Sequence, residues 1–270
     1  MKKLLSAIYP EWIKIINYRT FWILTGLYAA TLILLLLSLQ GILDNLTMNV
    51  NNKSPLPIPD FSVYAFPGVW QNLTYIAGYL KMFPAFLIII LITNEFTFRT
   101  LKQQIITGTS RLEFLNGKVM LIIMFSLAVA LLVALTGLFA GLTQDSSDIR
   151  LIFNNKLLFI PAHALELMTY MLFAAFLAVL FKRAGITVII FLLYSLIIEK
   201  ILVFKLPDDA GRFLPLEAAG KLVPLPNSSL MKLFGVSFSE YTSWQDATIC
   251  FVWIVVFILL IYRILIKRDL

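Results

Sequence analysis

Long apolar runs separated by short polar stretches set the pattern of this 270-residue chain. Crossing the hydrocarbon core of a bilayer as a helix takes about 20 consecutive apolar residues, and several runs reach that length. The pattern therefore predicts an all-α polytopic membrane protein with a single transmembrane domain over residues 1–270. The six predicted spans cover residues 21–39, 70–93, 119–142, 157–181, 185–204 and 247–266.

The residues that precede the first span have an amphipathic pattern. On a helical wheel Leu5, Trp12 and Ile15 share the apolar side, while Lys14 lies on the polar side. This pattern predicts a helix that lies flat in the inner headgroup layer. The alternative is a lead-in that only anchors the first span.

The stretch before the last span, residues 205–246, is long and interrupted by prolines and glycines. Its apolar pieces, such as residues 216–223, are too short to cross a membrane, so we expect short outer helices there. Ser243 and Asp246 have the spacing of a helix start signal, which predicts that the last span begins beside them.

Composition and charge agree with this interpretation. Hydrophobic residues make up 60% of the chain and charged residues 14%, whereas about 25% of the residues in a soluble domain are charged. Lys and Arg are more numerous in the segments that would be cytoplasmic if the N-terminus were inside. We therefore expect a multi-pass protein of the cell (inner) membrane with both termini in the cytoplasm. The net charge of +7 then reflects topology and contact with anionic lipid headgroups, not a nucleic acid partner.

A charged segment, residues 94–118, lies between the second and third apolar runs and must emerge on one face of the membrane. We expect a helix over residues 95–106, ended by Gly108 in the left-handed conformation. Ser110 and Glu113 form a capping box that starts a new helix leading into the third span. This predicts a rigid helix–turn–helix element joined to two spans, although an ordinary positive-inside loop is the alternative. Its charged residues are Glu95, Arg99, Lys102, Arg111, Glu113 and Lys118.

The order of residues in this segment resembles the loop between the second and third spans of ABC-2 type transporter permeases. Those proteins carry a Glu-aromatic pair, a Gly-Thr, a Leu-Leu-x-x-Pro and a Ser-Arg-x(6)-Lys run. Two departures, Arg99 where a Gly is common and residues 107–109 where a Pro is usual, indicate a divergent branch. The resemblance covers the architecture of the whole chain and the sequence of about 25 residues. The matching residues are Glu95-Phe96, Thr100, Gln103-Gln104, Ile105-Ile106, Gly108, Ser110-Arg111 and Lys118.

The resemblance implies a transport subunit, most simply of an exporter, in which two copies of this chain or two similar permeases form the pathway. A separate ATP-binding-cassette ATPase would bind below the charged segment and carry ATP and Mg. The sequence has no P-loop, because Gly117-Lys118 is followed by Val119 and lacks the earlier glycine. We therefore expect no enzyme activity, cofactor or metal in this chain. The residues that the resemblance assigns to ATPase coupling are Glu95, Arg99, Thr100, Gly108, Ser110, Arg111 and Lys118.

Four charged residues fall inside predicted spans, namely Lys81, Glu166, Glu199 and Lys200. Intramembrane charges usually face a pathway or one another. One interpretation is that the lysines extend to the outer boundary and the carboxylates lie in its wet layers. The other is that Lys81 and Glu166 form a pair that braces the second and fourth spans or lines an outer vestibule.

The same four charges support two rival functions, a membrane enzyme and an ion-coupled carrier, each of which would need them to converge. Broken helices at mid-membrane are typical of carriers, and Pro84 and Pro161 are the sequence features that hint at them. His163 lies on the same helix face as Glu166, but too few further ligands are nearby for a zinc site.

Overall fold

A computed structural model describes residues 12–51, 62–144, 151–226 and 241–267 of the chain. Over these residues the regular elements are helical, and no strand occurs among them. The helices are α2 (Arg19–Asn51), α3 (Gly68–Ala77), α4 (Met82–Thr97), α5 (Thr100–Ile106), α6 (Arg111–Gln144), α7 (Phe159–Phe181), α8 (Ala184–Leu193), α9 (Glu199–Lys205), α10 (Asp208–Gly211), α11 (Pro215–Lys221) and α13 (Trp244–Lys267). Two 3₁₀ turns, Gly78–Leu80 and Asn155–Leu158, and one π-turn, Tyr194–Ile198, join neighbouring helices.

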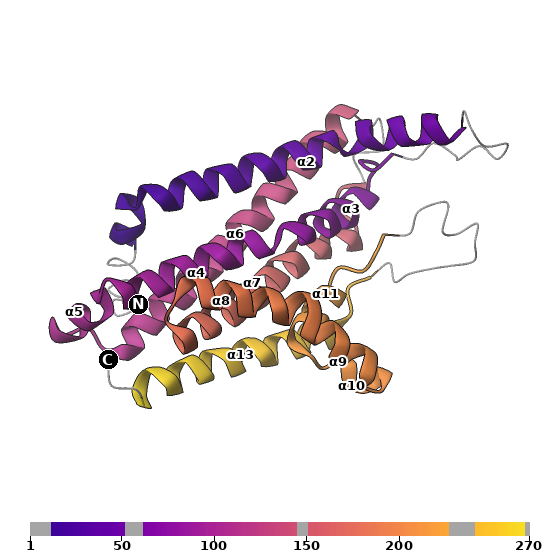
Figure 1. The fold of residues 1–270 in the computed structure, drawn as a ribbon. Helices are drawn as coiled ribbons and strands as arrows, with labels where there is room; N and C mark the ends of the chain where they lie inside the picture. The colour runs from indigo at the N-terminus through magenta and orange to yellow at the C-terminus, as the bar shows by residue number, and fades with distance from the viewer. Residues whose placement is uncertain (1–11, 52–61, 145–150, 227–240, 268–270) are drawn as a thin grey trace.

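The long helices lie lengthwise beside one another, and α5 caps one end of the bundle (Figure 1). We call this end the α5 end. Helix α2 begins there and α13 finishes there, whereas α9 and α10 lie at the opposite end (Figure 1). The first and last described segments therefore lie on the same side of the bundle, as the predicted topology requires. Which side faces the cytoplasm stays a prediction.

Helix α7 forms the centre of the bundle. It packs against α4, α6 and α13, and 72% of its most apolar stretch is buried, compared with 17% for α2. An aromatic cluster joins α7 to α8 and α13, because Phe173 of α7 lies 5.9 Å from Phe191 and 5.5 Å from Phe257 between ring centroids. Phe86 of α4 lies 5.9 Å from Phe191, and these separations are those of favourable ring pairs. Helix α2, by contrast, leaves most of its surface outside the bundle.

In the part of the chain that the structure describes, five helices are long and apolar enough to cross a membrane. The predicted second span over residues 70–93 is not one straight helix, because α3 and α4 meet at a bend of 43°. Pro84 explains the bend in part, since it has no N–H to donate to the carbonyl of Leu80 one turn earlier. The described helices reach the predicted six spans only if this bent pair crosses the membrane as one.

Other predicted boundaries also differ from the structure. The first span was predicted to end near residue 39, but α2 continues to Asn51. Local side-chain hydrogen bonds accompany this extension, such as the 2.8 Å bond from Gln40 Nε2 to Asp44 Oδ1 one turn away. Short helices before the last span are confirmed by α10 and α11. Helix α13 begins at Trp244, directly after the Ser243 start signal.

The predicted interfacial helix is described only in part, because residues 1–11, including Leu5, lie outside the described residues. Residues 12–17 are helical, with Ile15 buried and Trp12 exposed. The polar side of residues 12–17 is not wholly exposed, because Lys14 bonds to Glu95 of α4. The segment is therefore packed on the bundle.

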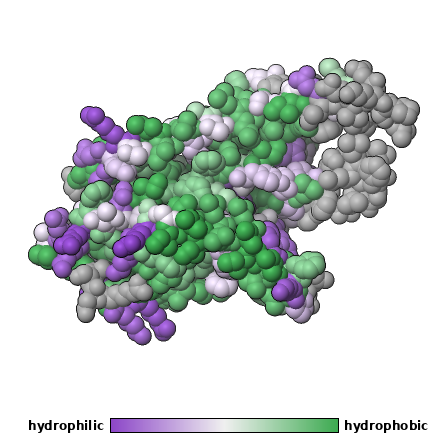
Figure 2. All heavy atoms as spheres, viewed as in Figure 1, coloured by the Kyte–Doolittle hydropathy of each residue, from purple (hydrophilic) through white to green (hydrophobic). Residues whose placement is uncertain are grey.

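The surface is the one expected of a membrane protein. Figure 2 shows apolar side chains over the middle of the visible face and hydrophilic ones toward its two ends, most of them at the α5 end. Large apolar side chains are exposed along the long helices, including Ile23, Leu34, Leu131 and Phe251. So much exposed apolar surface is stable in lipid but not in water.

Candidate coupling site

A cluster of polar side chains at the α5 end centres on Glu95, which is only 6% exposed. Glu95 Oε1 accepts hydrogen bonds from Lys14 Nζ at 2.9 Å and from Lys118 Nζ at 2.7 Å. Its other oxygen accepts a bond from Thr100 Oγ1 at 2.9 Å. We call Lys14, Glu95, Thr100 and Lys118 the Glu95 cluster. It connects residues 12–17, α4, α5 and α6 through one carboxylate.

The backbone places Thr100 under Glu95 by turning sharply after α4. Sequence reasoning predicted one helix over residues 95–106, which is wrong: α4 ends at Thr97, and α5 begins at Thr100. Between them Arg99 has a left-handed backbone with φ 55°, and its carbonyl accepts the first bond of α5 from Gln103 N–H. A left-handed residue ends a helix because it turns the chain away from the helical path. Arg99 occupies the position where the resembling family commonly has glycine, the residue that adopts this conformation most readily.

The turn between α5 and α6 has the predicted form. Gly108 has φ 104°, and its N–H and that of Thr109 bond to the carbonyls of Ile105 and Gln104. This is the Schellman arrangement that closes a helix at a glycine. Ser110 then begins α6 with the predicted capping box: Ser110 N–H donates to Glu113 Oε2 at 2.8 Å, and Glu113 N–H donates to Ser110 Oγ at 3.2 Å. The end of α5 and the start of α6 are therefore both satisfied by local hydrogen bonds.

Arg111 does not join the Glu95 cluster. Its Nη1 atom donates to the carbonyls of Leu265 at 2.6 Å and Ile266 at 2.7 Å, which lie near the end of α13. A cation at this place satisfies carbonyls that the helix itself leaves unpaired. Arg111 therefore ties the start of α6 to the end of the last long helix. Of the seven residues assigned to coupling, Glu95, Thr100 and Lys118 belong to the Glu95 cluster, and Ser110 and Gly108 shape the turn. Arg99 supplies the left-handed backbone between α4 and α5, and Arg111 bonds to α13.

Sequence reasoning missed the role of Lys14. The helical wheel assigned it to the solvent side, but it reaches a carboxylate 81 positions away along the chain. Asn94 adds a second link to the same region, because its Nδ2 donates to Tyr18 Oη at 3.0 Å. The clue in the sequence was that Glu95 directly follows an apolar run, where a carboxylate needs a basic partner.

The predicted pair between Lys81 and Glu166 is present. Lys81 Nζ lies 2.6 Å from Glu166 Oε1, and Glu166 Oε2 lies 3.1 Å from His163 Nδ1. Lys81 also lies over the ring of Tyr170, 4.4 Å from its centroid. Lys81 is at the bend between α3 and α4, whereas the other three residues belong to α7. The pair therefore fastens the bent segment to the centre of the bundle.

The other two intramembrane charges make separate contacts, both with α11. Glu199 is buried, and its Oε1 accepts bonds from the N–H groups of Leu216 at 2.8 Å and Glu217 at 2.6 Å. Lys200 extends outward, with 64% of its side chain exposed, and pairs with Glu217 at 2.8 Å. The outward extension expected of lysine thus holds for Lys200, whereas Glu199 stabilises the start of α11. The four charges do not form one constellation.

The described residues contain no group of three or more His, Cys, Asp and Glu side chains that could hold a metal ion. His163 and Glu166 are a hydrogen-bonded pair without a third ligand of that kind. Comparison with protein-family models and with curated proteins found no match to this chain.

Proposed function

We propose that this protein is the membrane-spanning permease subunit of an ABC-2 type ATP-driven exporter, moved by a separate ATPase that binds at α5. The observation that carries the proposal is the Glu95 cluster. It supports a role in force transmission because it fixes a short, rigid helix at the end of the bundle to several longer helices at once. The resemblance of residues 94–118 to the permease loop supports the same function independently.

The contacts of α5 and its flanking turns define which other helices would move with it. Helix α5 is directly continuous with α4 on one side and with α6 on the other, each through a turn of a few residues. Lys14 carries the displacement to the segment before α2, and Arg111 carries it to α13. Separating Glu95 from its lysines would leave buried charges unpaired, at a penalty of about 3–5 kcal/mol. Because of this penalty, the elements would move together rather than slide past one another.

The exposed side of α5 would bind the partner. Ile106, at the tip of the helix, is 76% exposed, and Phe98 just before the helix is 68% exposed. Apolar side chains that stand out beyond the spanning helices are suited to a protein contact. ATP and Mg would be bound by the partner, and the transport pathway would lie between two copies of this chain or between it and a similar permease.

The test is purification of the tagged full chain from its native membrane in a mild detergent. We expect a subunit with a P-loop to co-purify, together with ATP hydrolysis that vanadate inhibits. Ile106→Glu should abolish both without preventing membrane insertion. The matched control is Phe153→Glu, because Phe153 is 85% exposed but belongs to the segment that precedes α7, at the opposite end. Transport by the purified chain alone, without any ATPase subunit, would overturn the proposal.

The second candidate is an ion-coupled carrier, favoured by one observation. A buried charged group, Lys81 with Glu166 and His163, lies at the bend of a broken helix, as in carriers that use discontinuous helices. Transport by such a carrier in vesicles would need an ion gradient and no nucleotide. Abolition of transport by an ionophore in the absence of ATP would favour it over the permease.

A further inference from the structure

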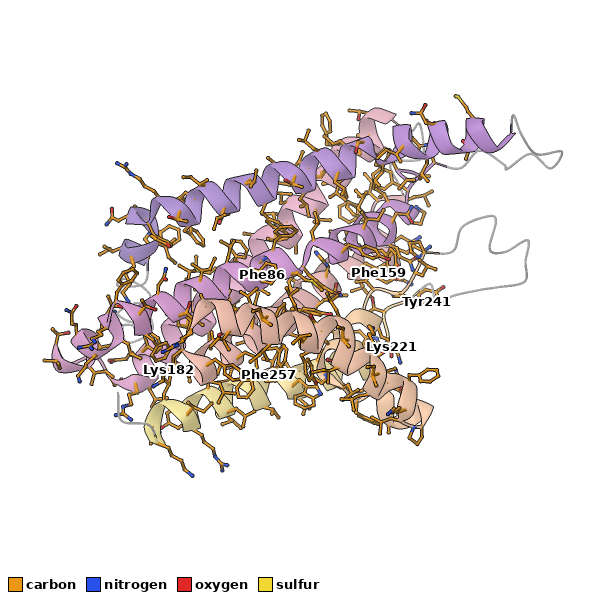
Figure 3. All side chains as sticks on the ribbon, viewed as in Figure 1. Phe86, Phe159, Lys182, Lys221, Tyr241 and Phe257 are labelled. Atoms are coloured by element: carbon orange, nitrogen blue, oxygen red, sulfur yellow. The ribbon has the colours of Figure 1, made fainter. Side chains whose placement is uncertain are left out.

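A cavity of about 730 Å³ opens at the α5 end between the turn that joins α4 to α5 and the turn that joins α7 to α8. The coupling function does not account for it. We call it the basic cleft. Its lining residues are Glu95, Phe96, Thr97, Arg99, Leu101, Lys102, Phe181, Lys182 and Arg183. Lys182 can be seen at this end of the bundle, far from Phe159 and Lys221 (Figure 3).

The charges of the cleft are unbalanced. Arg99, Lys102, Lys182 and Arg183 have no ion pair with any of the described residues, and Lys182 Nζ lies over the ring face of Phe96, 5.3 Å from its centroid. The one carboxylate in the lining, Glu95, is already bonded to two lysines outside the cleft. Among the described residues, four cations thus line one cavity whose single carboxylate is already paired elsewhere. An anionic ligand would relieve their mutual repulsion.

The backbone adds a second observation. Among the described residues other than glycine, Arg99 and Lys182 alone have positive φ values, 55° and 58°. The left-handed conformation disfavours residues with a Cβ by about 1–2 kcal/mol, and glycine would avoid that penalty. Both strained residues are basic, and both line the basic cleft. Strain of this kind is concentrated at binding sites, where the position of a side chain matters more than local stability.

The position of the cleft indicates the class of ligand. Arg99 lies two residues after the end of α4 and Lys182 directly after the end of α7, the points where two apolar helices would leave the hydrocarbon. Arg183 directly precedes α8, so the unpaired first-turn N–H groups of that helix lie beside the cleft and also favour an anion. The rings of Phe96 and Phe181 and the side chain of Leu101 supply an apolar wall. Phosphate groups joined to apolar chains are found at this depth of a membrane, and basic pockets between helices bind them.

We propose that the basic cleft binds the headgroup of an anionic phospholipid. Arg99, Lys102 and Arg183 contact its phosphate oxygens by charge-assisted hydrogen bonds, while Phe96 and Phe181 contact the glycerol and the first carbons of the acyl chains. The site does not depend on the transport function, because its ligand comes from the membrane itself. A bound lipid would join the α4–α5 turn to the α7–α8 turn, which share few other polar contacts among the described residues.

The experiment measures binding of water-soluble lipids to the purified full chain in a neutral detergent, with no ATPase present. The probes are dihexanoylphosphatidylglycerol, dihexanoylphosphatidylcholine, inorganic phosphate and a poly-glutamate peptide. The test variant is Lys102→Gln/Arg183→Gln. The control is Arg263→Gln/Lys267→Gln, which removes the same charge from exposed positions of α13. Size-exclusion profiles and melting temperatures establish that both variants fold.

We expect phosphatidylglycerol to bind at least ten times more tightly than phosphatidylcholine. The test variant should lose about 10- to 30-fold in affinity, corresponding to roughly 1 kcal/mol per removed cation, while the control changes by less than two-fold. Equal binding of the two lipids, or equal losses in the two variants, would overturn the proposal. Equal binding of inorganic phosphate would assign the cleft to free phosphate instead, and tighter binding of the acidic peptide would assign it to a protein partner.

Discussion

Removing either partner of the Lys81–Glu166 ion pair leaves the other charge buried, and the expected loss of stability can be worked from the structure. Glu166 is 3% exposed and Lys81 17% exposed, with 2.6 Å between Nζ and Oε1. Loss of one partner of a buried pair decreases the free energy of unfolding by about 3–5 kcal/mol. Lys81→Met should fall in this range, since Glu166 would keep only the contact with His163. Glu166→Gln should be milder, at about 2–3 kcal/mol, because Lys81 keeps the ring of Tyr170.

The double variant Lys81→Met/Glu166→Gln contains no unpaired charge. We expect it to lose about 2–3 kcal/mol, well below the sum of the single losses, which gives a coupling energy of about 4 kcal/mol. For a chain of this size that coupling corresponds to roughly 8–16 °C in melting temperature. Thermal unfolding of the four proteins in one detergent measures it. Additive losses would refute the reasoning, because the two side chains would then not interact in the folded protein.

Three further changes test the local structure. Arg99→Gly should raise the free energy of unfolding by about 0.5–1 kcal/mol, because glycine adopts φ 55° without strain but gains freedom in the unfolded chain; a lower melting temperature would contradict this. Ser110→Ala should lower the free energy of unfolding by about 1 kcal/mol and speed amide hydrogen exchange in the first turn of α6. Unchanged exchange would mean that the capping box is dispensable. Gly141→Ala would bring a Cβ to 2.5 Å from Phe66 Cζ and should lower the free energy of unfolding by about 1–3 kcal/mol; the control Gly26→Ala, with no atom within 4 Å, should melt at or slightly above the wild-type temperature.

Local signals in the sequence predicted local structure well. Gly108 ends α5, the Ser110–Glu113 box starts α6, and α13 begins beside Ser243, as expected. These features depend on a few neighbouring residues, so the sequence contains all the information needed to recognise them. The Lys81–Glu166 pair was also accessible, because heights along two spans can be compared by counting residues.

Features set by packing or by backbone strain could not be predicted. The break at Arg99 has no glycine or proline to mark it, and α2 continues past its apolar run through a polar stretch to Asn51. The contact of Lys14 with Glu95 depends on how the first segment packs against α4, which no pattern within either segment reveals. The link from Arg111 to α13 has the same character, since it spans 154 positions.

The π-helical turn at Tyr194–Ile198 limits the insertions and deletions that the chain would tolerate there. Within it, Glu199 N–H bonds to the carbonyl of Tyr194, five residues back rather than four. One extra residue in a helix rotates everything after it by about 100°. That rotation is what turns Glu199 toward α11, while Leu196 and Ile197 stay on the exposed side. Deleting a single residue here would restore a regular α-helix and swing the Glu199 carboxylate toward the lipid. The number of residues in this turn therefore sets which face the following helix turns toward α11. For that purpose the length of the turn matters more than the identity of any one side chain.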